Sequence, residues 1–166
     1  MRVKKLRGGK RYYSRLRDKA QTFTLDLRPG HCYDLWHEHF DRLGHSRRDG
    51  RIRSQHLSAL FTAFRRVIAQ VASTTEPVQV FVSIAPASEA EQDALYVHSP
   101  NPNGTPFPHP FEGVRWDAPP PSLVRRFVEN ESWQVGVVTA ADGQQWWVVR
   151  PFLVASAHRS GFRSNT

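Results

Sequence analysis

The apolar residues between Ser54 and Ser73 recur at helical spacing, and this pattern constrains the fold more than any other feature of the chain. Seven large apolar side chains fall on one stripe of a helix: Leu57, Leu60, Phe61, Phe64, Val67, Ile68 and Val71. An apolar stripe on a helix must be buried against another element. The pattern therefore predicts a helix over residues 54–73 that packs on a second layer, with Ser54 as its N-cap.

Strands are expected to form that second layer. Residues 77–85 (PVQVFVSIA) are rich in β-branched side chains, and residues 94–99 (ALYVHS) are typical of a returning strand. Residues 22–27 alternate between apolar and polar, as in a half-buried strand. The pair Asp142-Gly143, within residues 132–152, indicates a hairpin of two further strands.

Two more helices complete the expected fold. In residues 31–45 (HCYDLWHEHFDRLGH), four apolar side chains recur at helical spacing: Tyr33, Trp36, Phe40 and Leu43. A shorter helix is expected to begin near Ser122 and to bury Leu123, Val124, Phe127 and Val128. The resulting order is β-α-α-β-β-α-β-β. The predicted fold class is α+β, a largely antiparallel sheet with helices packed on one face.

Positive charge is concentrated at the N-terminus. The chain has 166 residues, which suits one domain, and a formal net charge of +8. Residues 1–19 hold nine Lys or Arg and one acid, whereas the residues after them hold fourteen of each sign. We therefore divide the chain into a basic N-terminal arm (1–19), a single α+β domain (20–155) and a polar C-terminal tail (156–166).

The basic arm has the composition of a nucleic-acid-binding segment. Its cations would neutralise phosphates, and Tyr12 and Tyr13 would stack on exposed bases. The candidate nucleic-acid-binding residues are Lys4, Lys5, Arg7, Lys10, Arg11 and Arg15. Docking to an acidic protein surface and a solvated tail are the two alternatives, because no signature of a known nucleic-acid-binding module accompanies these charges.

The helix expected over residues 31–45 also carries a polar stripe of histidines and carboxylates. Residues one helical turn apart can share a metal ion. The candidate ligands are Asp34, His37, Asp41 and His45. The HExxH pattern is not present, since His39 directly follows Glu38, and the polar side of any amphipathic helix would contain such residues. We therefore predict no metal and no cofactor, and a metal-dependent enzyme is the third functional alternative.

Other catalytic patterns are missing from the sequence, which contains no GxSxG, P-loop or GxGxxG motif. Cys32 is the single cysteine, so an intrachain disulfide is excluded and a reducing compartment is favoured. No signal-peptide core and no apolar span of membrane length is found, so we expect a cytoplasmic protein without membrane association. Cys32 beside His31 is either a small partly buried residue or a nucleophile.

Residues 99–121 form a proline-dense stretch without regular periodicity. A loop of this length within a compact domain is often functional, and proline restricts the backbone in advance of binding. The candidate partner-binding residues are Asn101, Asn103, Phe107, His109 and Phe111, together with His37 and Asp41. The alternative is a structural strap across the sheet, in which Phe107, Phe111 and Trp116 are buried.

Two stretches, YDLWHEHFD (33–41) and LYVHSPNPNGTPFPHPFEGVRW (95–116), together resemble a group of short uncharacterised bacterial proteins of the toxin-immunity type. The resemblance covers the body of the chain and brings no catalytic residue with it. It implies a non-catalytic binding protein that neutralises a toxin by covering its active site, and this is the function we expect. The basic arm departs from the acidic character usual in immunity proteins. Nucleic-acid binding through the arm is therefore the first alternative.

Overall fold

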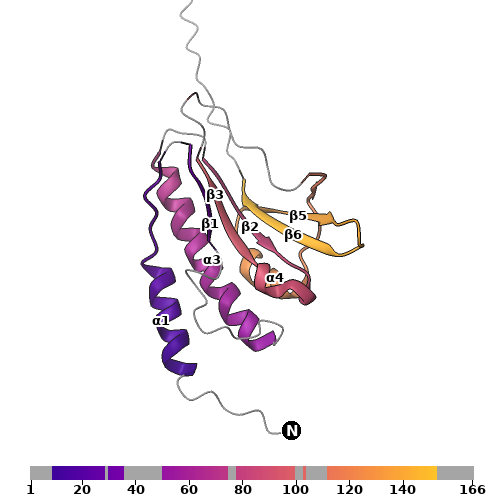
Figure 1. Cartoon of the computed structure of the whole chain (residues 1–166), viewed down its shortest axis with the longest axis horizontal. Coiled ribbons are helices and arrows are strands. Elements are labelled where there is room, and N and C mark those ends of the chain that lie inside the picture. Colours follow the sequence, from indigo (N-terminus) through magenta and orange to yellow (C-terminus); the bar gives the residue numbers. More distant parts are fainter. Residues whose placement is uncertain are drawn as a thin grey trace, which may run out of the picture.

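The computed structural model describes residues 9–28, 30–35, 50–74, 78–99, 103 and 112–152 (Figure 1). The helices in this part of the chain are α1 (Gly9–Gln21), α3 (Gly50–Ala72), the 3-10 helix η1 (Ala87–Gln92) and α4 (Ser122–Val128). The strands are β1 (Cys32–Leu35), β2 (Gln79–Ile84), β3 (Ala94–His98), β4 (Arg115–Trp116), β5 (Trp133–Thr139) and β6 (Gln145–Pro151).

The six strands form one sheet in the order β1-β3-β2-β6-β5-β4, and each neighbouring pair is antiparallel. The long helix α3 packs along the sheet, and α1 packs on α3 (Figure 1). This arrangement confirms the predicted α+β class with an antiparallel sheet. None of the described helices combines the length and the hydropathy that a membrane span requires.

The core lies between α3 and the sheet. Val82 is the cross-strand partner of both Leu95 and Val149, and cross-strand partners share one face of a sheet. These three valine and leucine side chains are fully buried in the same cluster as Phe61 and Phe64 of α3. The apolar stripe that predicted α3 is therefore the surface that the helix buries.

Helix α3 begins at Gly50, one turn before the expected N-cap Ser54. The prediction of Ser54 as N-cap is wrong because a tertiary contact holds the extra turn. Arg53, in that turn, forms a buried ion pair with Asp93, at 2.7 Å between Nη2 and Oδ1. The same Nη2 atom donates to the carbonyl oxygen of Ala85 at 2.6 Å.

The predicted strand over residues 22–27 is not a strand. Its alternation is present, because Phe23 is buried and Leu25 and Leu27 are half-buried against the core. The backbone, however, has no strand partner among the described residues. The Gln70 side chain takes that role: Oε1 accepts from the Leu25 N–H at 3.1 Å, and Nε2 donates to the Leu25 carbonyl oxygen.

Residues 32–35, predicted as the start of a helix, form the edge strand β1 instead. Tyr33 and Leu35 stand opposite Val97 and Leu95 of β3. The predicted helix rested on the spacing of Tyr33 and Trp36, whereas Tyr33 and Leu35 are two residues apart, as on one face of a strand. Pairing with β3 decides between the two. The rest of the predicted helix, from residue 36, lies outside the described residues up to 49.

The remaining expected elements are confirmed. Strands β2 and β3 and helix α4 lie where the sequence placed them. The β5–β6 hairpin turns at Asp142-Gly143, where the Gly143 N–H donates to the Ala140 carbonyl at 2.9 Å. Gly143 has a φ of 82°, a left-handed conformation that favours glycine. The expected C-terminal tail, 156–166, lies outside the described residues.

Candidate nucleic-acid interface

Charge is strongly segregated among the described residues. The three α-helices α1, α3 and α4 together carry eleven Lys or Arg and a single acid, Asp18. All other described residues together carry three Arg and ten acids. The residues after 19 carry equal numbers of positive and negative charges, but in the described fold these charges lie on different elements. In the folded chain, α3 and α4 add positive charge to that of α1.

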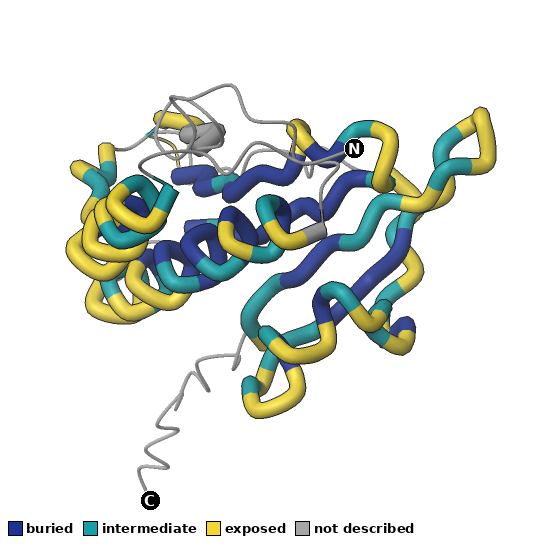
Figure 2. Tube along the Cα trace, turned by 90° about the horizontal axis from the view of Figure 1, so that it is seen from below, coloured by how far each residue is buried: buried dark blue, intermediate teal, exposed yellow. Residues whose placement is uncertain are grey.

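Ten of these eleven cations are exposed, and we call them the basic helical layer. Its members are Lys10, Arg11, Arg15, Arg17, Lys19, Arg51, Arg65, Arg66, Arg125 and Arg126. The outer surfaces of the helices are largely exposed (Figure 2). The eleventh cation, Arg53, is neutralised by Asp93 inside the protein. Its burial separates Arg53 from the other ten cations, because its side chain is only 7% exposed.

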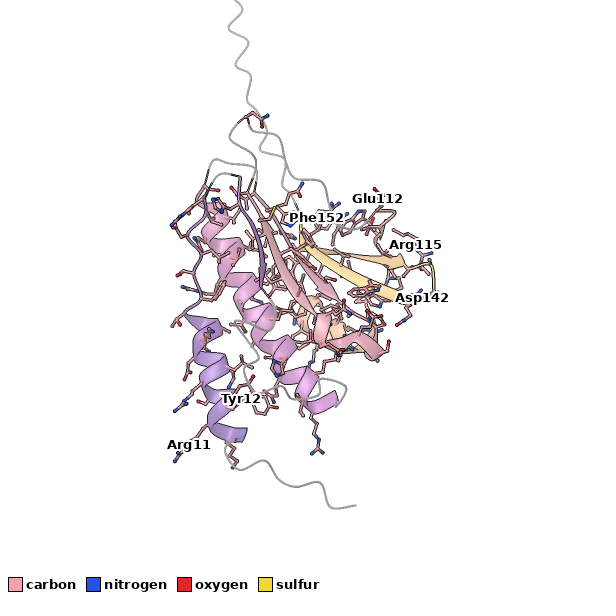
Figure 3. The ribbon with its side chains drawn as sticks, in the orientation of Figure 1. Arg11, Tyr12, Glu112, Arg115, Asp142 and Phe152 are labelled. Atoms are coloured by element: carbon pink, nitrogen blue, oxygen red, sulfur yellow. The ribbon has the colours of Figure 1, made fainter. Side chains whose placement is uncertain are left out.

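Half of the predicted basic arm is a folded helix. In α1, Leu16 is 5% exposed and Ala20 is fully buried, and both belong to the core. Tyr12 lies near His56, and Leu25 bonds to Gln70, so α1 and the following segment run along α3 in the same direction. The cations of α1 are therefore held at fixed positions. Figure 3 shows Arg11 on α1, at the opposite side of the molecule from Glu112 and Asp142.

The rings of Tyr12 and Tyr13 do not project into solvent as a stacking platform would. Both are half-buried and pack against the core, with their ring centroids 5.1 Å apart. The His56 ring lies 6.0 Å from Tyr12 and 6.4 Å from Tyr13. The two tyrosines thus fix α1 on α3, and the cations of the helix remain as its binding groups.

Arg65 and Arg126 connect the layer to the core. Arg65 Nε donates to Glu131 at 2.6 Å, and its guanidinium lies 5.2 Å from the Trp133 ring. Arg126 lies 4.6 Å from the ring of Phe127 and donates to the Ser54 hydroxyl. A shallow pocket of about 300 Å³ opens beside Arg126, lined by Ser54, Ser122 and Leu123. These contacts order two of the arginines at the α3–α4 side of the layer.

Most of the residues that the sequence singled out lie outside the described residues. Of the nucleic-acid candidates, Lys10, Arg11 and Arg15 are exposed on α1, whereas Lys4, Lys5 and Arg7 are not described. Of the partner-binding candidates, Asn103 is exposed, and Asn101, Phe107, His109, Phe111, His37 and Asp41 are not described. Of the metal candidates, Asp34 lies in β1, and His37, Asp41 and His45 are not described. The described part of the chain contains no cluster of three metal-ligating side chains.

Cys32 has neither of the two environments considered for it at the level of sequence. It is exposed on the edge strand β1, not partly buried at a helix start. Desolvation by nearby protein atoms raises the pKa of the Cys32 thiol. A reactive cysteine requires a lowered pKa, so this environment gives no support to a nucleophile.

Arg150, at the β4–β5–β6 end of the sheet, has a structural role. The Arg150 guanidinium lies 3.6 Å from the centroid of the Trp116 ring, and its Nε donates to Gln134 at 2.9 Å. Burial lowers the pKa of Arg150, and nearby Asp117 acts in the opposite direction. Trp116 lies over Gly136, where a side chain would overlap its ring. Glycine within a β-branched strand signals such a close approach, and the sequence analysis did not use that signal.

Comparison of the sequence with protein-family models and with curated proteins, and of the fold with solved structures, gives no match. The function of the chain is therefore inferred from the geometry and charge of its described residues. Seven members of the basic helical layer were not among the predicted nucleic-acid-binding residues. Two of them, Arg17 and Lys19, lie on α1, and the other five lie on α3 and α4: Arg51, Arg65, Arg66, Arg125 and Arg126. The signal available for them was the complete lack of acids in α3 and α4.

Proposed function

We propose that the protein binds nucleic acid through the basic helical layer and catalyses no reaction. The observation that carries this proposal is the charge of the three described α-helices, which together hold eleven cations and one acid. A surface of this kind neutralises phosphates and gains free energy by releasing their counterions. We propose that this binding takes place in the cytoplasm, the location that we expect from the sequence.

The surface of the layer favours a polyanion over a protein partner. Protein interfaces derive most of their affinity from buried aromatic and aliphatic anchors. Among the described residues, Phe152 is the large apolar residue that is highly exposed. It follows β6 and belongs to no helix. The layer thus offers charge without apolar anchors. This supports phosphate binding.

Toxin neutralisation, the function implied by the resemblance, is the alternative proposal. Its candidate residues in the proline-dense stretch lie outside the described residues, apart from the exposed Asn103. Nothing in the described geometry favours a metal-dependent enzyme. We therefore base the first experiment on the charged helices.

The test compares two double variants that each remove two exposed cations. Arg11→Gln with Arg15→Gln removes charge from α1, and Arg28→Gln with Arg115→Gln removes the same charge outside the layer. Binding to a labelled duplex is measured by fluorescence anisotropy at several salt concentrations. We expect the α1 variant to reduce the slope of log affinity against log salt by about 2, and the control to leave it unchanged.

Equal losses of affinity in the two double variants would refute the proposal, because they would reflect net charge alone. Wild-type binding that does not weaken with salt would refute it as well. Deletion of residues 1–19 is not a suitable test. It removes Leu16 from the core and would reduce stability together with binding.

A further inference from the structure

We infer that the ligand of the basic helical layer is the phosphate backbone of double-stranded nucleic acid, bound without base stacking. This inference rests on the proposed function and specifies its ligand. Proteins that bind single strands combine a basic groove with aromatic side chains on which successive bases stack. Whether the layer has such aromatic groups therefore distinguishes the two kinds of ligand.

In the part of the chain that the structure describes, the aromatic rings beside the layer are engaged by other protein groups. Tyr12 and Tyr13 pack on each other and on His56. Phe127 stacks on Phe61 with 4.8 Å between centroids and an interplanar angle of 11°. Its ring also lies 4.6 Å from the Arg126 guanidinium.

Trp133 is occupied in the same way. Its ring lies 6.0 Å from Phe61 at an interplanar angle of 15°, and 4.8 Å from Phe64. The Arg65 guanidinium lies 5.2 Å from its centroid. A base could stack on these aromatic rings only after an arginine had left them or the core had opened. Among the described residues, the layer therefore presents its cations without an aromatic ring that is open to stacking.

The rigidity of the layer also favours a duplex. Helix α1 has 13 residues, which corresponds to a length of about 20 Å, or roughly six base pairs of a duplex. Leu16 and Ala20 fix the helix on α3, so the backbone positions that carry its cations keep their spacing. A duplex presents phosphates at regular positions and with a higher charge density than a single strand. Cations on a fixed helix can contact these phosphates without the entropic cost of ordering a flexible ligand.

The expected preference follows from the number of phosphate contacts. With the five cations of α1 each neutralising one phosphate, log affinity falls with log salt at a slope of about −4.5 for a duplex and −3.5 for a single strand. The two slopes differ by about 1. Where both probes bind equally at about 1 M salt, the duplex is therefore bound about tenfold more tightly at about 0.1 M. Contacts to phosphates alone carry no sequence information, so unrelated duplexes should bind equally.

The experiment measures binding of the full chain to three labelled probes at about 0.1 M salt. Two are duplexes of about 25 base pairs with unrelated sequences, and the third is one of their single strands. We expect the two duplexes to bind equally and about tenfold more tightly than the single strand. The Arg28→Gln with Arg115→Gln variant should show the same preference.

The outcomes separate this inference from the proposed function. A single strand bound within about threefold of the duplexes would overturn the inference and leave nucleic-acid binding in place. Duplexes that differ by more than about tenfold would overturn contact through the backbone alone. No salt-dependent binding to any of the three probes would overturn both the inference and the proposed function.

Discussion

The buried ion pair between Arg53 and Asp93 offers the sharpest test of the fold. Asp93 accepts from Arg53 Nε at 2.9 Å, from Arg53 Nη2 at 2.7 Å and from the Ala85 backbone N–H at 2.8 Å. The two side chains are 7% and 2% exposed. Asp93→Asn keeps the shape of the side chain, removes its charge and places an amide donor where the carboxylate accepts.

The expected cost is large because Arg53 would remain buried without a counter-ion. Removing one partner of a buried ion pair costs about 3–5 kcal/mol, compared with a total stability of about 5–15 kcal/mol for a domain. For a chain of this size, each kcal/mol lowers Tm by about 2–4 °C. We therefore expect Asp93→Asn to lower Tm by about 6–20 °C.

The assay is urea denaturation followed by tryptophan fluorescence, together with calorimetry for Tm. The exposed pair Arg28–Asp26, 2.6 Å apart with 65% and 74% exposed side chains, supplies the control. Asp26→Asn should cost less than about 1 kcal/mol. The double variant Arg53→Met with Asp93→Leu should recover part of the lost stability, since apolar groups replace both charges but the Ala85 N–H and carbonyl lose their side-chain partners. If Asp93→Asn costs no more than Asp26→Asn, the reasoning is refuted.

Two further predictions concern the β5–β6 hairpin. Gly136→Ala places a β-carbon against Val114 and 2.8 Å from Trp116 Cε3, so we expect a loss of about 1–3 kcal/mol in urea denaturation, and an unchanged midpoint would contradict this packing. The backbone N–H and the side chain of Gln144 lower the pKa of Asp142. Because the folded pKa is depressed, Asp142 contributes stability above its unfolded pKa and loses it as the pH falls below about 4. The Tm difference between wild type and Asp142→Asn should therefore shrink from about pH 7 to pH 3, and a constant difference would contradict the prediction.

The parts of the fold that the sequence predicted are those determined by local patterns. The stripe of α3, the β-branched run of β2 and the Asp-Gly turn each lie within a few neighbouring residues. The failures depend on contacts distant in sequence. Leu25 lies in no strand because Gln70, 45 residues away, satisfies its backbone. Tyr33 is in a strand because Val97 stands opposite it.

The candidate site was predictable only in part for the same reason. Counting charges along the chain identified Lys10, Arg11 and Arg15, which are close together in sequence. It could not identify Arg66 or Arg125 as members of the helical layer, because acids outside the three described α-helices balance their charge in the sequence. The sequence also did not reveal that Tyr12 packs inward, since the partner of its ring is His56 of α3.

The segregation of charge gives the described part of the chain an electric dipole. The described α-helices have an excess of ten positive charges and the other described residues an excess of seven negative charges. The electric field of a polyanion orients such a molecule during diffusion, so that the basic helices face the polyanion and the acidic part faces away from it. Screening limits this orientation to a Debye length, about 8 Å at physiological salt. Within that distance the fraction of productive collisions rises, and association becomes faster without any additional contact in the final complex.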